Sequence, residues 1–192
     1  MVENMEKMWI LAVVPHRDAR GVLRKHSEKL MGEGITGVYC FPWAAPIARL
    51  SKPLTPDELK QCARILREAT GANNGKFSAG EAASCPFPAR KNAASSVLFG
   101  PRLDLEIPAG IFCNVTQKIK SLFSPLIIGA FLMPKDHEAQ FRDSMSLREK
   151  LEFRAAAVAN MSWQPVQIDT DDGGEIAYKW KIEKLRWLPG KI

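Results

Sequence analysis

Apolar residues recur along this chain with two spacings, one typical of buried strands and one typical of helices. Short, nearly continuous apolar runs rich in β-forming residues lie at 9–14, closed by Pro15, and at 35–41, and they predict buried strands. Between them, 18–31 has helical spacing, with an apolar side that includes Leu23 and with glycines after its end. The first part of the chain therefore predicts strand, helix, strand.

The segment from Thr55 to Gly71 carries the clearest local signal. Thr55 and Glu58 have the spacing of a capping box, in which each side chain hydrogen-bonds the backbone N–H of the other residue. Pro56 suits the first helical position. One face of the predicted helix is apolar and consists of Leu59, Cys62, Ala63, Leu66 and Ala69.

The middle of the chain has weaker patterns, and its end is predicted to be β. We expect irregular extended segments at 77–87 and 96–105, a helix at 108–120, a strand at 123–133 and a long helical stretch from 134 to about 160. Segments 162–169 and 176–188 flank the Asp- and Gly-rich run 170–174, which predicts a hairpin. The alternation slips near Glu183–Lys184, which predicts a bulge. These elements favour an α+β fold of antiparallel sheets with outer helices.

Composition places the chain among ordinary globular proteins. It has 192 residues, of which 46% are hydrophobic and 25% are charged, enough for one domain or two intimate lobes. No run reaches the roughly 18 apolar residues of a membrane span. The first residues include acids and lack the basic region of a secretory signal. We therefore expect a cytoplasmic location and no membrane partner.

The net charge of +6 favours anionic partners such as nucleotides or RNA. The excess lies partly around Arg90-Lys91 and partly in the last strand (Lys179, Lys181, Lys184, Arg186 and Lys191). Neither group is a dense basic tract. The alternative to an anion-binding patch is therefore a generally basic surface with no role in binding. The four cysteines, Cys40, Cys62, Cys85 and Cys113, have no C-x-x-C spacing. We expect free thiols, with no metal site and no cofactor.

Two segments share an aromatic residue and a proline leading into an apolar strand. They are Phe41-Pro-Trp-Ala-Ala-Pro-Ile-Ala-Arg-Leu50, within 37–54, and Phe123-Ser-Pro-Leu-Ile-Ile-Gly-Ala-Phe131, within 121–133. The first resembles the first signature of the 2H phosphoesterase superfamily, the 2′-5′ RNA ligase and cyclic nucleotide phosphodiesterase-like proteins. That signature reads roughly Phe-Pro-x-His-x-Thr-Leu-Ala-x-Leu. The second segment resembles the second copy that the family carries downstream.

The resemblance implies a single two-lobed domain over 1–192. The lobes would be pseudo-symmetric antiparallel sheets with outer helices around a central cleft, with Ala44 and Leu126 facing each other across it. In the family, each lobe contributes a His-x-Thr/Ser pair. One histidine activates the attacking group and the other protonates the leaving group, because the imidazole pKa lies near neutral pH.

Both catalytic pairs are replaced in this chain. The histidine positions fall on Ala44 and Leu126, and the threonine positions fall on Pro46 and Ile128. General acid–base catalysis contributes roughly 100- to 10,000-fold per participant, so loss of both histidines leaves a negligible rate. His16 and His137 are not in surroundings that support a relocated pair. The resemblance therefore implies a catalytically degenerate protein with an apolar cleft floor.

Three functions remain open. The cleft can hold a nucleotide or RNA end, with charge from Arg49 and Lys52 and with Trp43 stacking on a base. The chain can be a non-catalytic scaffold for protein–protein interaction, with its cleft filled. It can also be an RNA or cyclic-nucleotide phosphodiesterase with relocated residues. Alternatively, Arg49 and Lys52 are solvated loop charges and Trp43 is a core residue. For the two motif segments, the alternative is that they are ordinary apolar strands unrelated to the family.

Overall fold

The computed structural model describes residues 7–35, 39–40, 43–69, 76–87, 96–105, 107, 110–129, 131–168 and 175–187. Its strands are β1 (Met8–Pro15), β2 (Tyr39–Cys40), β3 (Ala45–Leu50), β4 (Lys76–Pro86), β5 (Ser96–Leu103), β6 (Ile119–Leu122), β7 (Phe131–Pro134), β8 (Leu151–Ile168) and β9 (Glu175–Trp187). The helices are α1 (Arg17–Gly32), α2 (Pro56–Ala69) and α3 (Glu138–Met145), the last preceded by a 3₁₀ turn at Lys135–His137. The predicted α+β class is confirmed. None of these helices has the length and apolar character that a membrane crossing needs.

Strand β8 connects two halves of one antiparallel sheet. Its first residues, 151–154, pair with β4, and β5, β7 and β2 follow in order. Residues 155–163 of β8 pair with β1, which is followed by β3 and β6. Residues 157–168 also pair with β9. We call β9–β8–β1–β3–β6 the first half-sheet and β4–β5–β7–β2 the second half-sheet.

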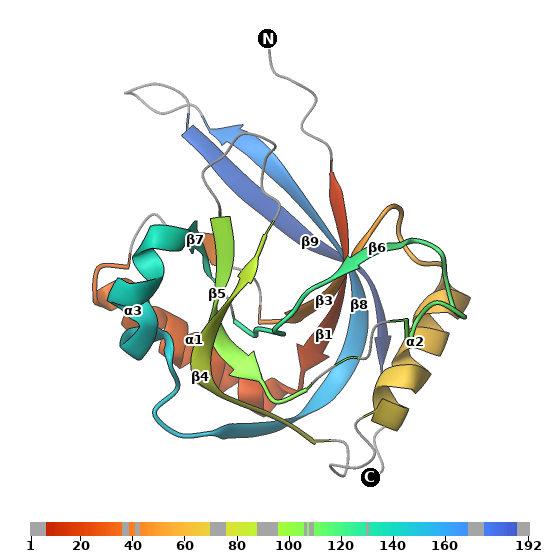
Figure 1. The fold of residues 1–192 in the computed structure, drawn as a ribbon, viewed down its shortest axis with the longest axis horizontal. Helices are drawn as coiled ribbons and strands as arrows, with labels where there is room; N and C mark the ends of the chain where they lie inside the picture. The colour runs from red at the N-terminus through yellow and green to blue at the C-terminus, as the bar shows by residue number, and fades with distance from the viewer. Residues whose placement is uncertain are drawn as a thin grey trace.

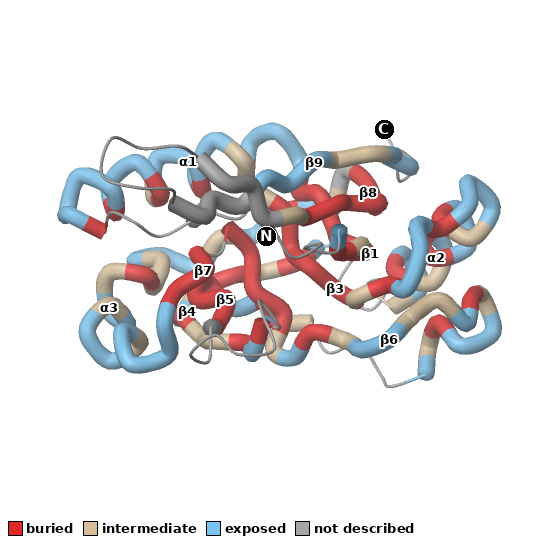
Figure 2. Tube along the Cα trace, turned by 90° about the horizontal axis from the view of Figure 1, so that it is seen from above, coloured by how far each residue is buried: buried red, intermediate tan, exposed pale blue. Residues whose placement is uncertain are grey.

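Helices cover the outer face of each half-sheet (Figure 1). α2 packs against β8 and β9 of the first half-sheet. Against the second half-sheet, Leu30 of α1 and Met145 of α3 share an apolar cluster with Phe99 and Phe131. Figure 2 shows the buried parts of the strands running between helices whose outer sides are exposed. The inner faces of both half-sheets belong to a second, larger apolar cluster, so they pack against each other.

Several predicted elements are confirmed. The apolar run 9–14 is β1, which lies centrally between β3 and β8, and the helix at 18–31 is α1. The extended segments at 77–87 and 96–105 are β4 and β5, which pair with each other. The C-terminal strands pair as a hairpin would require, although its turn lies outside the described residues. The bulge is also present, because Asn160 pairs with Lys184 and Met161 with Ile182, which leaves Glu183 unpaired.

The predicted helical stretch from 134 to about 160 is wrong beyond Met145. α3 has eight residues, and β8 begins at Leu151. The alanine-rich run 155–159 favours a helix, but intrinsic propensities differ by at most about 0.7 kcal/mol among ordinary residues. Here β1 and β9 pair with that run from its two sides. This strand pairing on both sides shows that tertiary contacts override the local preference.

Three other segments differ from the prediction. The predicted helix at 108–120 is instead a series of turns at 110–115 that leads into β6, with Gly110 at φ 86°. The predicted strand at 123–133 is interrupted, because Gly129 has φ 60° and only β7 is a regular strand. Of 35–41, only Tyr39–Cys40 is a strand, and residues 36–38 and 41 lie outside the described part.

The capping box at the start of α2 is confirmed and extends to a distant loop. Glu58 accepts a hydrogen bond from the Thr55 N–H at 2.7 Å, and the Glu58 N–H donates to the Thr55 hydroxyl at 3.3 Å. Lys118 also donates to the Glu58 carboxylate, at 2.6 Å. Burial raises the pKa of Glu58, but hydrogen bonds from Lys118, Thr55 and Thr116 outweigh it and bring the pKa to about 2. The carboxylate therefore ties α2 to the loop before β6.

We expect Glu58→Gln to lower the free energy of unfolding by about 1–2 kcal/mol at pH 7. The folded-state pKa is depressed, so the stabilisation is present above the ordinary value of 4.5 and is lost as pH falls towards 2. Urea denaturation of the wild type and the variant, at pH 7 and at pH 3, measures the difference in the free energy of unfolding at each pH. The control is Glu68→Gln, because Glu68 only meets Arg64 at 3.8 Å on an exposed helix face. Equal effects of the two substitutions would contradict the expected role of Glu58.

Candidate functional site

The first motif lies at the start of β3, where a bulge changes the direction of its side chains. Pro46 pairs with Ala12 of β1, whereas Ala48 pairs with Leu11, so Ile47 has no partner on β1. Cross-strand partners share a face of the sheet. Arg49, which pairs with Ile10, therefore lies on the same face as Pro46.

That shared face is the inner one. On β8, Asn160 pairs with Leu11 and its side chain bonds Leu54, just before α2, so Leu11 and Asn160 mark the outer face. Ile10 and Ala12 alternate with Leu11 and therefore face inward. Both are fully buried, as are their β8 partners. The interior between the half-sheets is consequently apolar around the first motif.

The second motif crosses from one half-sheet to the other. The Phe123 N–H donates to the carbonyl of Ile47 at 2.8 Å, which places it beside the first motif. After a cis peptide bond before Pro125, the Leu126 carbonyl accepts from the Leu103 N–H at 2.9 Å. The Ile128 N–H then donates to Pro101 at 3.0 Å. The two motif regions, which are far apart in the sequence, are thus neighbours in the structure.

All four positions that replace the family's catalytic residues are buried. Ala44, Leu126 and Ile128 are 1%, 4% and 0% exposed and belong to the same apolar cluster. Pro46 is buried beside them on β3. None of these side chains carries a hydroxyl or a titratable group. These positions therefore offer no general acid or base and no donor to a phosphate.

Aromatic rings fill the space between the inner faces. Phe87, at the end of β4, meets Trp163 of β8 edge-on, with ring centroids 4.7 Å apart. Phe87 also stacks on Phe123 at 6.0 Å. All three are buried. Because Phe87 comes from the second half-sheet and Trp163 from the first, this contact closes the interior by direct packing.

The three candidate ligand-binding residues differ in their burial and surroundings. Arg49 is half-buried on the inner face and has no ion-pair partner among the described residues. Lys52 is exposed in the loop after β3. Trp43 packs against the apolar cluster, and its buried Nε1 meets no hydrogen-bond partner within the described part of the chain. Trp43 therefore fits the core alternative, and Arg49 remains the best candidate for an anion contact.

The three histidines are exposed or half-buried, whereas the four motif positions are buried. His16 is exposed just before α1, with Nδ1 3.4 Å from the Asp18 carboxylate. His137 is exposed before α3 and meets the Phe141 ring. His26 is half-buried with Nε2 3.2 Å from the Met145 carbonyl, and burial lowers its pKa, as expected for a packing residue. Within the described ranges, no three His, Cys, Asp or Glu side chains are grouped to hold a metal ion.

The cysteines whose side chains the structure describes give no reactive site in the interior. Cys62 and Cys85 are free and buried, and Cys113 is free and exposed. Burial raises the pKa of Cys62 to about 12, and the charge of Glu58 adds to this. Such a thiol stays protonated at neutral pH and is a poor nucleophile. The expectation of a free, buried Cys62 is confirmed, while the side chain of Cys40 lies outside the described residues.

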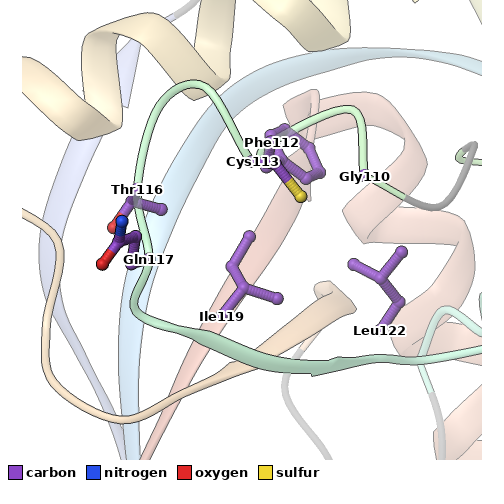
Figure 3. Close-up of a pocket in the computed structure, with 7 residues that line it drawn as sticks. All are labelled: Gly110, Phe112, Cys113, Thr116, Gln117, Ile119 and Leu122. Carbon is purple, nitrogen blue, oxygen red and sulfur yellow. The ribbon is translucent and has the colours of Figure 1, made fainter.

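A small pocket lies outside the interior, beneath the loop 110–118 (Figure 3). Its volume is ≈ 160 Å³, and its lining is mainly apolar, with Phe112, Ile119 and Leu122 beside Cys113. Binding sites for small molecules usually have roughly 300–1,000 Å³, so this pocket is too small for a nucleotide. Its lining includes Leu122 of the second motif region but none of the four positions that replace the family's catalytic residues. The pocket therefore adds no second candidate for the family's active site.

Comparisons with protein-family models, with curated proteins and with solved structures found no match for this chain. The resemblance to the 2H phosphoesterases consequently depends on the two motifs, and its consequences for function are proposals.

Proposed function

We propose that this chain is a catalytically inactive 2H phosphoesterase-like protein that binds a macromolecular partner at its surface. One observation carries the proposal. All four positions of the former His-x-Thr pairs are buried in apolar packing. A site for phosphodiester chemistry needs a proton donor, a proton acceptor and water or a hydroxyl within reach. The buried side chains at these four positions supply none of these.

The arrangement of the chain supports the resemblance on which this proposal depends. The motif regions lie side by side, and the two antiparallel half-sheets carry their helices on the outside. Both features agree with what the family implies. The pseudo-symmetry of the lobes and the facing of Ala44 and Leu126 across a cleft stay predictions.

Filling of the interior favours a role at the surface over a ligand site at the motifs. An apolar floor cannot hold a phosphate without paired donors, because burying an unpaired charge costs several kcal/mol. The aromatic contacts of Phe87 also fill part of the space between the inner faces of the half-sheets. A scaffold needs no such space. Of the three functions open from the sequence, a non-catalytic scaffold fits this geometry best.

A nucleotide held at the edge of the interior is the second candidate. Arg49 supports it, because a half-buried guanidinium that has no ion-pair partner among the described residues is suited to an anion from solution. Lys52 follows in the adjacent loop and is exposed. Trp43 is the weaker member of the set, since it packs against the core.

We expect no turnover when the full chain meets 2′,3′-cyclic nucleotides or 2′-5′-linked oligonucleotides, and no binding of the cyclic nucleotides. Product formation should equal that of a blank without protein. The thermal midpoint should be unchanged by the cyclic nucleotides, because only a ligand that binds the native state raises it. Chromatography of the products and a thermal melt with each cyclic nucleotide give the two readouts.

Arg49→Ala and His16→Ala/His137→Ala separate the alternatives. A midpoint that rises with a nucleotide in the wild type and not in Arg49→Ala would favour the second candidate. Hydrolysis abolished by the double histidine substitution would favour a relocated catalytic pair. Hydrolysis that survives this substitution would contradict the proposal altogether.

A further inference from the structure

The last strand carries four basic side chains on one face. Lys179, Lys181, Lys184 and Arg186 are all exposed. Their partners on β8 are Gln164, Ser162, Asn160 and Val158, which alternate along that strand and so share one face. That face is the outer one, which Asn160 marks. We call these four residues the basic face of β9.

The bulge at Glu183 produces this arrangement. In a regular strand Lys179 and Lys181 would point to one side, and Lys184 and Arg186 to the other. The extra residue shifts the alternation of side chains by one position, so both pairs project to the outer side. Trp180, Ile182 and Leu185 take the opposite face. The cations thus follow a line of roughly 20 Å along β9.

Most of this charge is not neutralised within the described part of the chain. Glu183 pairs with Lys181 at 3.1 Å and with Lys7 at 2.9 Å. Lys179, Lys184 and Arg186 have no ion-pair partner among the described residues. Exposed cations in a line, with one acid among them, form a surface that attracts an extended polyanion.

Protection of a sheet edge is the simpler explanation for lysines on β9. Among the described residues β9 pairs with β8 alone, so its other edge is open, and lysines on edge strands oppose aggregation. That role needs charge at the edge but does not need all four cations on one face. The bulge that places them together is therefore evidence for a binding role.

We propose that the basic face of β9 binds the phosphate backbone of a single-stranded nucleic acid. Phosphates advance by about 3.4 Å per nucleotide along the axis of a duplex strand, and by more along an extended single strand. Same-face residues of a strand repeat at about 6.6 Å, so successive cations can meet successive or alternate phosphates. This inference depends on the non-catalytic surface role proposed above, and it names a nucleic acid rather than a protein as the macromolecular partner. The former active site takes no part in it.

Anisotropy titration of the full chain with a labelled oligouridylate of roughly 12 nucleotides tests the proposal. The logarithm of the binding constant should fall with the logarithm of salt concentration with a slope of up to about −3, from four contacts at about −0.7 each. Lys184→Gln/Arg186→Gln should weaken binding about tenfold at about 50 mM salt and reduce the slope by roughly 1.4. All substituted side chains are exposed, so far-ultraviolet circular dichroism should not change.

Lys25→Gln/Lys135→Gln is the matched control, because it removes the same charge from α1 and from the turn before α3. It should leave the affinity within about twofold of the wild type. Equal losses in the two double variants would overturn the proposal in favour of general positive charge. Polyglutamate that competes equally well would overturn it in favour of an acidic protein partner, and an absence of binding at low salt would also overturn it. None of these results would alter the turnover measurement, so the proposed loss of catalysis is tested separately.

Discussion

Replacing Leu126 with histidine, the family's catalytic residue, should lower the free energy of unfolding by about 3 kcal/mol at pH 8. Leu126 is 4% exposed and belongs to the apolar cluster that joins the half-sheets. The imidazole would lose these apolar contacts and bring ring nitrogens into packing that offers them no partner. Urea denaturation at fixed pH measures the loss.

The destabilisation should increase by roughly 2 kcal/mol when the pH is lowered from 8 to 5. Burial disfavours the charged imidazolium, so the pKa of the new histidine would be lower in the folded state than in the unfolded state. Below its ordinary pKa of about 6.5, the unfolded state binds a proton that the folded state does not. Stability therefore falls as the pH falls through this range.

Leu185→His is the control for Leu126→His. Leu185 is 41% exposed on β9, so the same change of side chain should alter stability by no more than about 0.5 kcal/mol, at either pH. An Leu126→His protein as stable as the wild type would mean that water reaches position 126. The former cleft would then be open, and the proposal of a filled interior would be wrong.

Elements with a complete local signal could be predicted from the sequence. The start of α2 is specified by the Thr55–Glu58 pair and Pro56, whose interactions involve only neighbouring residues. The bulge in β9 appears in the sequence as a slip of the apolar alternation between Ile182 and Leu185. Both predictions are confirmed, because the signal for each feature lies within a few neighbouring residues.

Elements specified by distant partners could not be predicted. The loop 110–118 has apolar residues at helical spacing, yet Lys118 reaches Glu58 on α2 and Gly110 takes a positive φ. The alanine-rich part of β8 is a strand because β1 and β9 pair with it. In each segment the local preference is weak, and contacts with residues far away in the sequence decide the conformation.

The residue types at the candidate site can be read from the sequence, whereas their geometry cannot. The residues Ala44, Pro46, Leu126 and Ile128 by themselves indicate an apolar floor, and all four are buried. The bulge at Ile47 has no signal in the sequence, and it places Arg49 on the inner face. Asn160 was also missed, although a lone amide in the apolar run 155–163 is a recognisable sign of a buried polar contact.

Asn160→Leu should lower the free energy of unfolding by about 3 kcal/mol. Asn160 is fully buried on β8, where its Nδ2 donates to the Leu54 carbonyl at 2.7 Å and its Oδ1 accepts from the Leu54 N–H at 3.2 Å. Leucine keeps a similar volume but leaves both backbone groups of Leu54 without a partner. Leu54 is itself buried, so water cannot replace these bonds.

Ser162→Ala is the matched control, because Ser162 lies on the same face of β8 and is also buried. Its hydroxyl makes one hydrogen bond, to Glu183 at 2.8 Å, so its loss should cost about 1 kcal/mol or less. The two variants should also differ in which part of the chain is destabilised. Asn160 holds the segment that leads into α2, so hydrogen exchange should quicken at the start of α2 in Asn160→Leu and not in Ser162→Ala. Unchanged exchange there, together with equal stabilities, would mean that α2 is held on the sheet by its apolar face alone.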